Sequence, residues 1–503
     1  MKAKVYLVGA GPGDPGLITV QGKACIQQAD VVIYDYLASP ALLKYAHKSA
    51  ELIYVGKKGG DHTLSQDEIN ALIVEKARSG GIICRLKGGD PYIFGRGGEE
   101  AEVLFNAGIS FEIVPGVTSA IAAAAYAGIP LTHRKLASTL AFITGHEDPA
   151  KEESSINWSS LAAGIGTLVF FMGVKNLPKI AEKLIAHGKP PDTPVALIRW
   201  GTTPRQQTVS GTLETIVEKA RAAGLKAPAI IVVGDVVNLR RSLKWFENRP
   251  LLGKRIVVTR ARQQASDLVR LLSDLGAECL EYPTIKIMPP EDPQPLKQAV
   301  ENLGAYDWIV FTSVNGVIFF FEQLFASGKD VRALGRMQTA AIGPATAARL
   351  FEYGLTSDIV PETYRAESVV DAFGKVKMKG KKILLPRAAE ARPILPKELK
   401  KMGAAVDEIP AYQTLKAVQN TDDLVQRLKD NRIDVITFTS SSTVKNFKAL
   451  LPAENFLELI RDITIASIGP ITTDTAKELG FDVHINAESY TIPGLVEAIL
   501  HYY

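Results

Sequence analysis

Short apolar runs rich in β-branched residues alternate with helical patterns from one end of the chain to the other. Strands that are each followed by a helix build parallel sheets, so this alternation predicts an α/β protein. A chain of 503 residues is too long for one hydrophobic core, and we expect roughly three or four compact domains. The predicted strands are Val5–Val8, Val31–Tyr34, Ile82–Leu86, Leu168–Met172, Ala229–Val233, Ile256–Thr259, Trp308–Phe311, Ile383–Leu385 and Val435–Phe438.

The alternation breaks between Leu239 and Lys254. This segment contains the charged, proline-containing run Arg240–Pro250, and a fresh strand follows it. Exposed segments of this composition commonly separate domains. We therefore predict a first module over residues 1–245, with subdomains of about 1–130 and 131–245. A linker over 246–252 and a second module over 253–503 complete the chain.

The second module contains an internal repeat. Gly253–Ala261 recurs as Gly380–Ala388, and Asp307–Ser313 recurs as Asp434–Ser440, each 127 residues later. Ala341–Pro344 recurs in similar form as Ser467–Pro470. The repeat predicts two similar α/β lobes with a cleft between them, one made of 253–287 plus 415–503 and the other of 288–414.

Polar residues end the repeated strands of both lobes, with Arg260 matching Arg387 and Thr312-Ser313 matching Thr439-Ser440. Parallel sheets bind ligands at the carboxyl ends of their strands, so this match favours a shared ligand cleft. The alternative is that the Thr and Ser side chains only cap the helices that follow.

Composition excludes several classes of protein. A formal net charge of +4 over a chain of this length is too weak a field to indicate a nucleic-acid partner. The apolar run at the N-terminus ends at Gly9, too early for a signal peptide, and no later stretch has the length of a membrane helix. The three cysteines are far apart and suit a reducing compartment. We expect a soluble cytoplasmic protein with no membrane partner.

The stretch Val5–Leu17 leads from a strand into glycines at 11, 13 and 16, the GxGxxG spacing of a dinucleotide-binding loop. Chemistry argues against a pyrophosphate there, because Pro12 and Pro15 have no N–H to donate and Asp14 adds a negative charge. A proline-stiffened turn suits a flat substrate or a neutral to cationic cofactor. A nicotinamide-dependent oxidoreductase stays open as the alternative, as does a turn that binds nothing.

Glycine-rich loops follow other predicted strands as well. Arg85–Glu100 contains five glycines together with basic and acidic side chains, and Pro115–Ser119 repeats the theme of a Pro-Gly turn followed by Thr-Ser. A third segment, Ala125–Arg134, ends the Ala-rich helix. So many turns that expose backbone at strand ends indicate a ligand held by main-chain groups.

With these motifs the first 245 residues or so resemble uroporphyrinogen-III C-methyltransferase, a member of the S-adenosylmethionine-dependent tetrapyrrole methylases. The resemblance covers nearly the whole first module, and the motifs are highly specific in combination. They are Val8–Pro15, Tyr34–Leu37, Arg85–Glu100, Val114–Ala120, Tyr126–Arg134, Thr144–His146 and Phe171–Gly173.

The remainder, Leu252–Tyr503, resembles uroporphyrinogen-III synthase, a family whose motifs are sparser. The duplicated lobes support this resemblance, and so does the position beside the methylase, since the product of the synthase is the substrate of the methylase. The matching motifs are Phe311–Ser313, Pro410–Thr414, Phe438–Ser440 and Ser467–Pro470.

The two resemblances imply a bifunctional enzyme of tetrapyrrole biosynthesis. Its first module has the two-domain tetrapyrrole methylase fold, and its second has a bilobal synthase fold with two similar parallel-sheet α/β lobes. The synthase half is expected to cyclise hydroxymethylbilane to uroporphyrinogen III with inversion of one ring, without a cofactor. The methylase half is expected to methylate that product twice with S-adenosylmethionine and give precorrin-2, the branch point towards siroheme and cobalamin.

The resemblance also implies the roles of individual residues. Asp35 is the expected proton acceptor and Lys57 the proton donor of methyl transfer, and Tyr412 is the expected proton donor of ring closure. The residues expected to hold S-adenosylmethionine are Pro12, Gly88, Gly89, Asp90, Ile93, Thr118, Ser119, Met172, Gly201 and Ala229, with Asp90 accepting hydrogen bonds from the ribose or the amino group.

Uroporphyrinogen carries eight carboxylates, so we expect Arg85, Arg96 and Arg134 to face the substrate, since a guanidinium binds a carboxylate with two hydrogen bonds. Thr312, Ser313, Ser440 and Thr472 are expected to hold carboxylates in the synthase half. The histidines have no metal-binding spacing, and we expect no metal. Family resemblance implies a homodimer through the methylase half. A bilobal ligand binder without catalysis stays open as the alternative for the second half.

Overall fold

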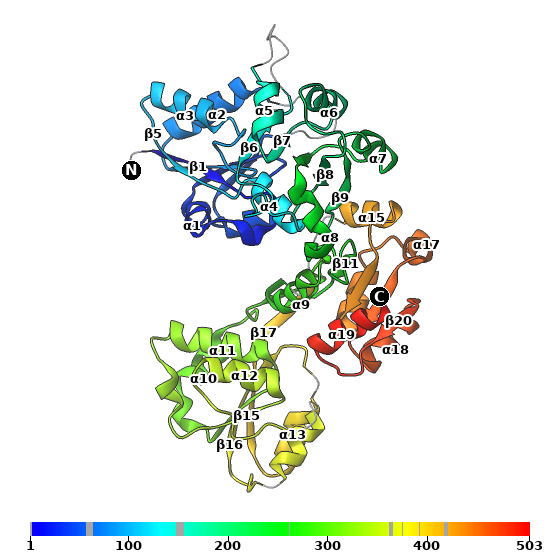
Figure 1. The fold of residues 1–503 in the computed structure, drawn as a ribbon. Helices are drawn as coiled ribbons and strands as arrows, with labels where there is room; N and C mark the ends of the chain where they lie inside the picture. The colour runs from blue at the N-terminus through cyan, green and yellow to red at the C-terminus, as the bar shows by residue number, and fades with distance from the viewer. Residues whose placement is uncertain are drawn as a thin grey trace. The chain divides into compact units, whose positions relative to one another are not determined.

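The computed structural model describes residues 3–56, 64–146, 155–260, 262–361, 366–374, 376–391, 393–416 and 421–503 (Figure 1). Packing divides the chain into two compact units. The first is residues 1–255 with 270–279 and Tyr503, and the second is residues 256–269 with 280–502. We describe each unit by itself.

The first sheet of the first unit is fully parallel in the order β3-β2-β4-β1-β5. Its strands bury side chains on both faces, with Val5 and Leu7 in one core and Val8 in the other. All carboxyl ends therefore lie at one edge. The strands are β1 Lys4–Gly9, β2 Val31–Tyr34, β3 Glu51–Tyr54, β4 Ile82–Lys87 and β5 Ser110–Val114, and the helices are α1 Val20–Gln28, α2 Gln66–Arg78 and α3 Gly97–Asn106.

The second sheet has the order β6-β7-β10-β8-β9 and corrects a prediction from the sequence. Only β6 and β7 run parallel, whereas β10 is antiparallel to β7 and β8, and β8 is antiparallel to β9. The reason is that a turn over residues 200–206, without a helix, joins β8 to β9 as a hairpin. The strands are β6 Leu140–Thr144, β7 Thr167–Phe171, β8 Pro194–Arg199, β9 Gln207–Thr212 and β10 Ala229–Val233; the helices are α4 Ser119–Tyr126, α5 Trp158–Gly164, α6 Leu177–Ala186, α7 Ile216–Ala222 and α8 Arg240–Leu243.

The third and fourth sheets follow the internal repeat. The third sheet has the order β12-β11-β18-β19-β20, and the fourth has β13-β17-β16-β14-β15. The repeated segments lie on β11, β18 and β19 in one sheet and on β16, β14 and β15 in the other, in the same order. This confirms the two similar lobes. Their strands are β11 Arg255–Val258, β12 Glu278–Glu281, β13 Ile285–Met288, β14 Trp308–Phe311, β15 Gln338–Ala341, β16 Lys382–Ala388, β17 Ala405–Lys416, β18 Val435–Phe438, β19 Thr464–Ser467 and β20 Val483–Asn486.

The lobe limits suggested by the sequence, 287/288 and 414/415, fall inside strands β13 and β17, which pair with each other antiparallel. We therefore propose that this lobe spans about residues 285–416. The helices of both lobes are α9 Arg262–Asp274, α10 Gln294–Glu301, α11 Val314–Ala326, α12 Pro344–Glu352, α13 Ala366–Phe373, α14 Ile394–Lys401, α15 Asp422–Lys429, α16 Ser441–Lys448, α17 Phe456–Ile460, α18 Pro470–Glu478 and α19 Ile492–Tyr502. None of the helices described here is both long and apolar enough to cross a membrane.

Candidate active sites

Three glycine-containing loops meet in backbone contact at the carboxyl edge of the first sheet. Gly11 and Gly89 exchange two backbone hydrogen bonds of 3.2 and 2.7 Å. A Cβ on Gly9 would lie 2.5 Å from the Cα of Gly116, and a Cβ on Gly116 would lie 2.3 Å from the carbonyl oxygen of Gly89. Only glycine fits at these contacts, and the loops that follow β1, β4 and β5 form a single cradle. We call these loops, residues 9–16, 88–97 and 115–119, the glycine cradle.

The first loop of this cradle does not present a phosphate site. The carboxylate of Asp14 accepts hydrogen bonds from the N–H of Gly16 at 2.7 Å and from the hydroxyl of Tyr126 at 2.7 Å. The helix α1 begins only at Val20, with Thr19 as its cap. A diphosphate at this loop would meet an anion and would lack the converging N–H groups of a helix N-terminus, which supports the chemical argument made from the prolines.

Asp90 fixes the second loop to the third. Its carboxylate accepts hydrogen bonds from the backbone N–H groups of Tyr92 at 2.8 Å, Ile93 at 3.1 Å and Gly116 at 3.0 Å. Next to it, a Cβ on Gly89 would lie 3.8 Å from the backbone nitrogen of Ser119. Asp90 therefore shapes the cradle before any ligand binds, and its bond to a ribose stays a prediction.

The second sheet adds a turn to this region. The hydroxyl of Thr202 accepts a hydrogen bond of 3.0 Å from the backbone N–H of Asp14. A Cβ on Gly13 would lie 3.5 Å from the carbonyl oxygen of Gly201 and 2.6 Å from the side chain of Thr203. The structure thus brings the predicted cofactor residue Gly201 next to the loop that contains Pro12.

Strained backbone marks the neighbouring strand ends. Met172 follows β7 with a φ of 55°, Trp200 follows β8 with a φ of 49°, and Phe94 in the second loop has a φ of 53°. Such conformations cost free energy in residues other than glycine and cluster at functional sites. Ala229 begins β10 and pairs with Arg199 at the end of β8, so it lies at the same edge as the turn over residues 200–206.

Arg85, which was predicted to bind substrate, lies inside the protein against two carboxylates, and its contact with substrate stays a prediction. Its side chain on β4 is only 3% exposed, and its Nε contacts Glu100 at 3.3 Å while its Nη2 contacts the carboxylate of Asp35 at 3.3 Å. A guanidinium with these partners is satisfied inside the protein. Arg85 instead holds Asp35, the predicted proton acceptor, whose side chain is 25% exposed at the carboxyl end of β2.

Lys87 completes this buried group of charges. Its Nζ lies 2.6 Å from Glu100, which has no exposed side-chain surface. Burial and the nearby charge of Arg85 lower the pKa of Lys87, while Glu100 opposes this shift. The two cations Arg85 and Lys87 therefore balance two carboxylates, that of Glu100 and that of Asp35 itself.

The other predicted polar residues lie in different settings. Arg96 is exposed and forms a two-point ion pair with Glu99, its Nε lying 2.9 Å from the carboxylate, and Arg134 is exposed in the turn before β6. Lys57, the predicted proton donor, lies outside the described residues.

A set of exposed apolar side chains lies on the loops after β2, β4 and β7; the sequence predicted Ile93 and Met172 as cofactor residues and missed the other three. Large apolar side chains that face solvent together indicate a binding surface. Aromatic residues directly beside glycine-rich motifs were the available signal, as in the run Asp90–Arg96. The set, which we call the apolar rim, comprises Tyr36, Leu37, Ile93, Phe94 and Met172.

In the second unit the structure brings Tyr412 to Ser313. Their hydroxyl oxygens lie 3.0 Å apart although the residues are 99 positions apart in sequence. The register of β17 against β16 shifts between Arg387 and Ala388, so that Arg387 pairs with Pro410 and Ala388 pairs with Tyr412. A β-bulge of this kind re-aims a side chain. Tyr412 is 8% exposed and stacks on Phe319.

The capping alternative holds for two of the predicted hydroxyls. Ser313 caps α11 by accepting from the N–H of Gly316, and Ser440 caps α16 by accepting from the N–H of Thr443. Thr312 directly precedes the first cap. Thr472 is buried in the first turn of α18, next to Ile471, whose carbonyl accepts from Ser441. The structure pairs Tyr412 with Ser313, and it brings the segment of Ser440 close to that of Thr472.

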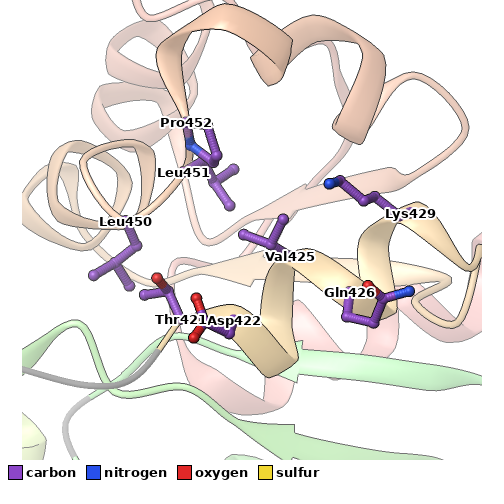
Figure 2. A pocket seen from close by; sticks show the side chains of 8 residues that line it. All are labelled: Thr421, Asp422, Val425, Gln426, Lys429, Leu450, Leu451 and Pro452. Carbon is purple, nitrogen blue, oxygen red and sulfur yellow. The ribbon is translucent and has the colours of Figure 1, made fainter.

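A hollow of about 490 Å³ also lies in this unit, beside α15, with Asp422, Val425 and Lys429 on its wall (Figure 2). None of the predicted site residues lines it. It therefore has no part in the sites above.

Two family models match the chain. Residues 4–217 match Tetrapyrrole (Corrin/Porphyrin) Methylases, and residues 266–497 match Uroporphyrinogen-III synthase HemD.

Relatives match over the whole chain or over the first half. The chain is 40% identical to the porphyrin biosynthesis protein HemD of Ruminiclostridium josui, over 99% of this chain and 97% of that protein. It is 57% identical to the S-adenosyl-L-methionine-dependent uroporphyrinogen III methyltransferase of Methanosarcina barkeri, over 47% of this chain and 92% of that protein. Among solved structures, the chain is similar to uroporphyrin-III C-methyl transferase from Thermus thermophilus, crystallised with S-adenyl homocysteine. The two sequences are 38% identical, the match covers 47% of this chain and 99% of the Thermus protein, and the TM-score is 0.40.

Proposed function

This chain belongs to the family in which a tetrapyrrole methylase is fused to a uroporphyrinogen-III synthase, and for this bifunctional enzyme of tetrapyrrole biosynthesis we propose two specific reactions. The second module cyclises hydroxymethylbilane to uroporphyrinogen III with inversion of one ring. The first module transfers two methyl groups from S-adenosylmethionine to that product and gives precorrin-2, for siroheme or cobalamin.

The glycine cradle is the observation that carries the methylase proposal. Its loops approach each other through backbone at Gly9, Gly89 and Gly116, which leaves main-chain groups to grip a ligand. The anionic Asp14 suits a sulfonium compound better than a diphosphate. S-adenosylmethionine, when bound, supplies an already activated methyl group, so the chain's contribution is mostly to position the reacting atoms. Residues of the cradle, with Met172, Gly201 and Ala229, would hold it.

The apolar rim supports a macrocycle of pyrrole rings as the methyl acceptor. Tyr36 and Leu37 follow Asp35 directly, and Ile93 and Phe94 lie on the second loop of the cradle. Apolar side chains that surround a carboxylate can hold the face of a macrocycle against it. Asp35, which Arg85 keeps in place, would then take a proton from the methylated macrocycle. Lys57 would act as the proton donor.

Ring closure needs a proton donor for the hydroxyl that leaves hydroxymethylbilane. A tyrosine hydroxyl donates a hydrogen bond or a proton at neutral pH. The hydroxyl oxygen of Tyr412 lies 3.0 Å from that of Ser313, and this hydrogen bond holds the oxygen in place. We assign Tyr412 to this step and the hydroxyls of Thr312, Ser313, Ser440 and Thr472 to carboxylates of the substrate.

Asp35→Asn tests the methylase assignment. Because the amide cannot accept the proton, methyl transfer to uroporphyrinogen III should fall about 100-fold or more. Binding of S-adenosylhomocysteine, measured by calorimetry, should stay within about twofold. The matched control is Asp192→Asn, an exposed carboxylate without a partner among the described residues. Methyl transfer at the control's rate would remove Asp35 from the mechanism.

The setting of the enzyme follows from the same reasoning. We propose that it acts in the cytoplasm, because three free thiols suit a reducing compartment. We also propose that it forms a homodimer through the methylase module. Sedimentation equilibrium of the full chain gives its mass in solution, and a monomer at micromolar concentration would contradict the dimer.

A further inference from the structure

Arg199 is a partly buried cation without a counter-charge in the described part of the chain. It is the last residue of β8, and its Nε is fully buried with no hydrogen-bond partner. No ion pair or hydrogen bond of this side chain is found among the described residues. Other arginines with little exposure do have carboxylate partners, since Arg85 has Asp35 and Glu100, and Arg240 has Glu247.

An unpaired guanidinium in such a place is costly. Removing an ionised group from water without a partner costs free energy, which proteins normally offset with an opposite charge. The free energy is recovered when a ligand brings the missing anion. The arrangement therefore indicates an anion that is supplied from outside the chain.

Arg199 also lies beside the predicted catalytic residues of methyl transfer. Of these residues it is Asp35 that the described part of the chain connects to Arg199: Trp200, the residue after Arg199, contacts the ring of Tyr36 edge-on with centroids 6.0 Å apart, and Tyr36 directly follows Asp35. Burial raises the pKa of Tyr36, and the positive charge of Arg199 opposes that shift, so the guanidinium acts on this hydroxyl. On the other side, Arg199 pairs in the sheet with Ala229, a predicted cofactor residue.

We propose that Arg199 binds a carboxylate in the methylase site. This rests on the proposed function of the first module. Both molecules expected there carry carboxylates, namely the macrocycle with eight of them and the methionine part of S-adenosylmethionine with one. A guanidinium suits either, because it binds a carboxylate with two parallel hydrogen bonds. Arg199 was not among the residues predicted from the sequence to bind a carboxylate.

The test uses Arg199→Gln and Arg199→Met in the full chain. The methionine variant keeps most of the apolar stem of the side chain, so it guards against loss of packing alone. Arg221→Gln, an exposed arginine of α7 with no partner among the described residues, is the matched control. Thermal unfolding reports whether each variant is folded. Arg199→Lys should recover part of any lost binding, because lysine restores the positive charge but not the two parallel N–H donors of the guanidinium.

Two binding measurements separate the two carboxylates. If the macrocycle is bound, the KM for uroporphyrinogen III rises roughly 10-fold to 100-fold in both variants, while the Kd of S-adenosylhomocysteine is unchanged. If the methionine part is bound, the Kd of S-adenosylhomocysteine rises by a similar factor, and the Kd of its decarboxylated analogue does not change. Folded variants with both constants as in the control would overturn the inference. Wild-type chain that binds no S-adenosylhomocysteine would instead overturn the proposed function.

Discussion

Tyr412 shows how a single side chain is placed by features that lie far apart in the sequence. Its strand, β17, contains a bulge opposite β16, and its hydroxyl reaches the residue that caps α11. The aromatic ring stacks on Phe319 of that same helix. The backbone irregularity and the helix cap together hold the hydroxyl oxygen in one place, as a proton donor requires.

Tyr412→Phe should slow ring closure of hydroxymethylbilane about 100-fold or more, because the variant keeps the stacked ring and loses only the hydroxyl. Methylation of added uroporphyrinogen III should not change. The matched control is Tyr353→Phe, whose ring stacks on Phe321 and whose hydroxyl has no hydrogen bond among the described residues. Ring closure at equal rates in both variants would show that Tyr412 is not the donor.

Residue types alone predicted part of the candidate sites. The family resemblance pointed to Asp35 and Tyr412, whose roles stay predictions, and Arg85 was assigned to the substrate because arginine suits carboxylates. Its burial beside Glu100 could not be read from the sequence, since the two residues meet only when α3 packs on the sheet. Arg199 was missed for the same reason. Whether a carboxylate lies beside its guanidinium depends on the folded structure and not on the neighbouring sequence.

At the scale of elements, the position of the strands was predictable and their direction in one sheet was not. The predicted strands Trp308–Phe311 and Val435–Phe438 have the observed bounds of β14 and β18. Strand-helix alternation wrongly implied a parallel second sheet. In that sheet, β10 pairs between β7 and β8, a long-range choice that no local pattern encodes.

Gly116→Ala tests the contact on which the glycine cradle depends. The new Cβ would lie within 2.6 Å of the backbone of both Gly89 and Gly9, so the loops must separate. We expect a loss of about 1–3 kcal/mol in the free energy of unfolding, as overpacking typically costs. Binding of S-adenosylhomocysteine should weaken at least 10-fold.

Gly98→Ala is the control for this substitution, because a Cβ there meets nothing within 4 Å. It lies in the first turn of α3 and should leave both stability and binding close to the wild type, or raise stability slightly. If Gly116→Ala behaved like Gly98→Ala in calorimetry and in denaturant unfolding, the cradle would not be a rigid part of the cofactor site.

At the scale of the whole molecule, the repeat within the second module was the most informative signal. Two copies of a strand sequence that end in similar residues predicted two lobes, and both sheets place those copies in the same order. The lobe limits were harder to place from the sequence, because strands β13 and β17 run across the limits that the sequence suggested. The family fusion explains why both modules occur in one chain: one makes the substrate of the other.

The most direct test of two linked reactions in one chain supplies only the starting materials. The purified chain is incubated with hydroxymethylbilane and S-adenosylmethionine labelled in its methyl group, and the product is analysed by mass spectrometry. We predict a cyclic tetrapyrrole that carries two labelled methyl groups, with the label lost when either Asp35→Asn or Tyr412→Phe replaces the wild type. An unlabelled macrocycle from the wild-type chain, or no macrocycle at all, would contradict the account.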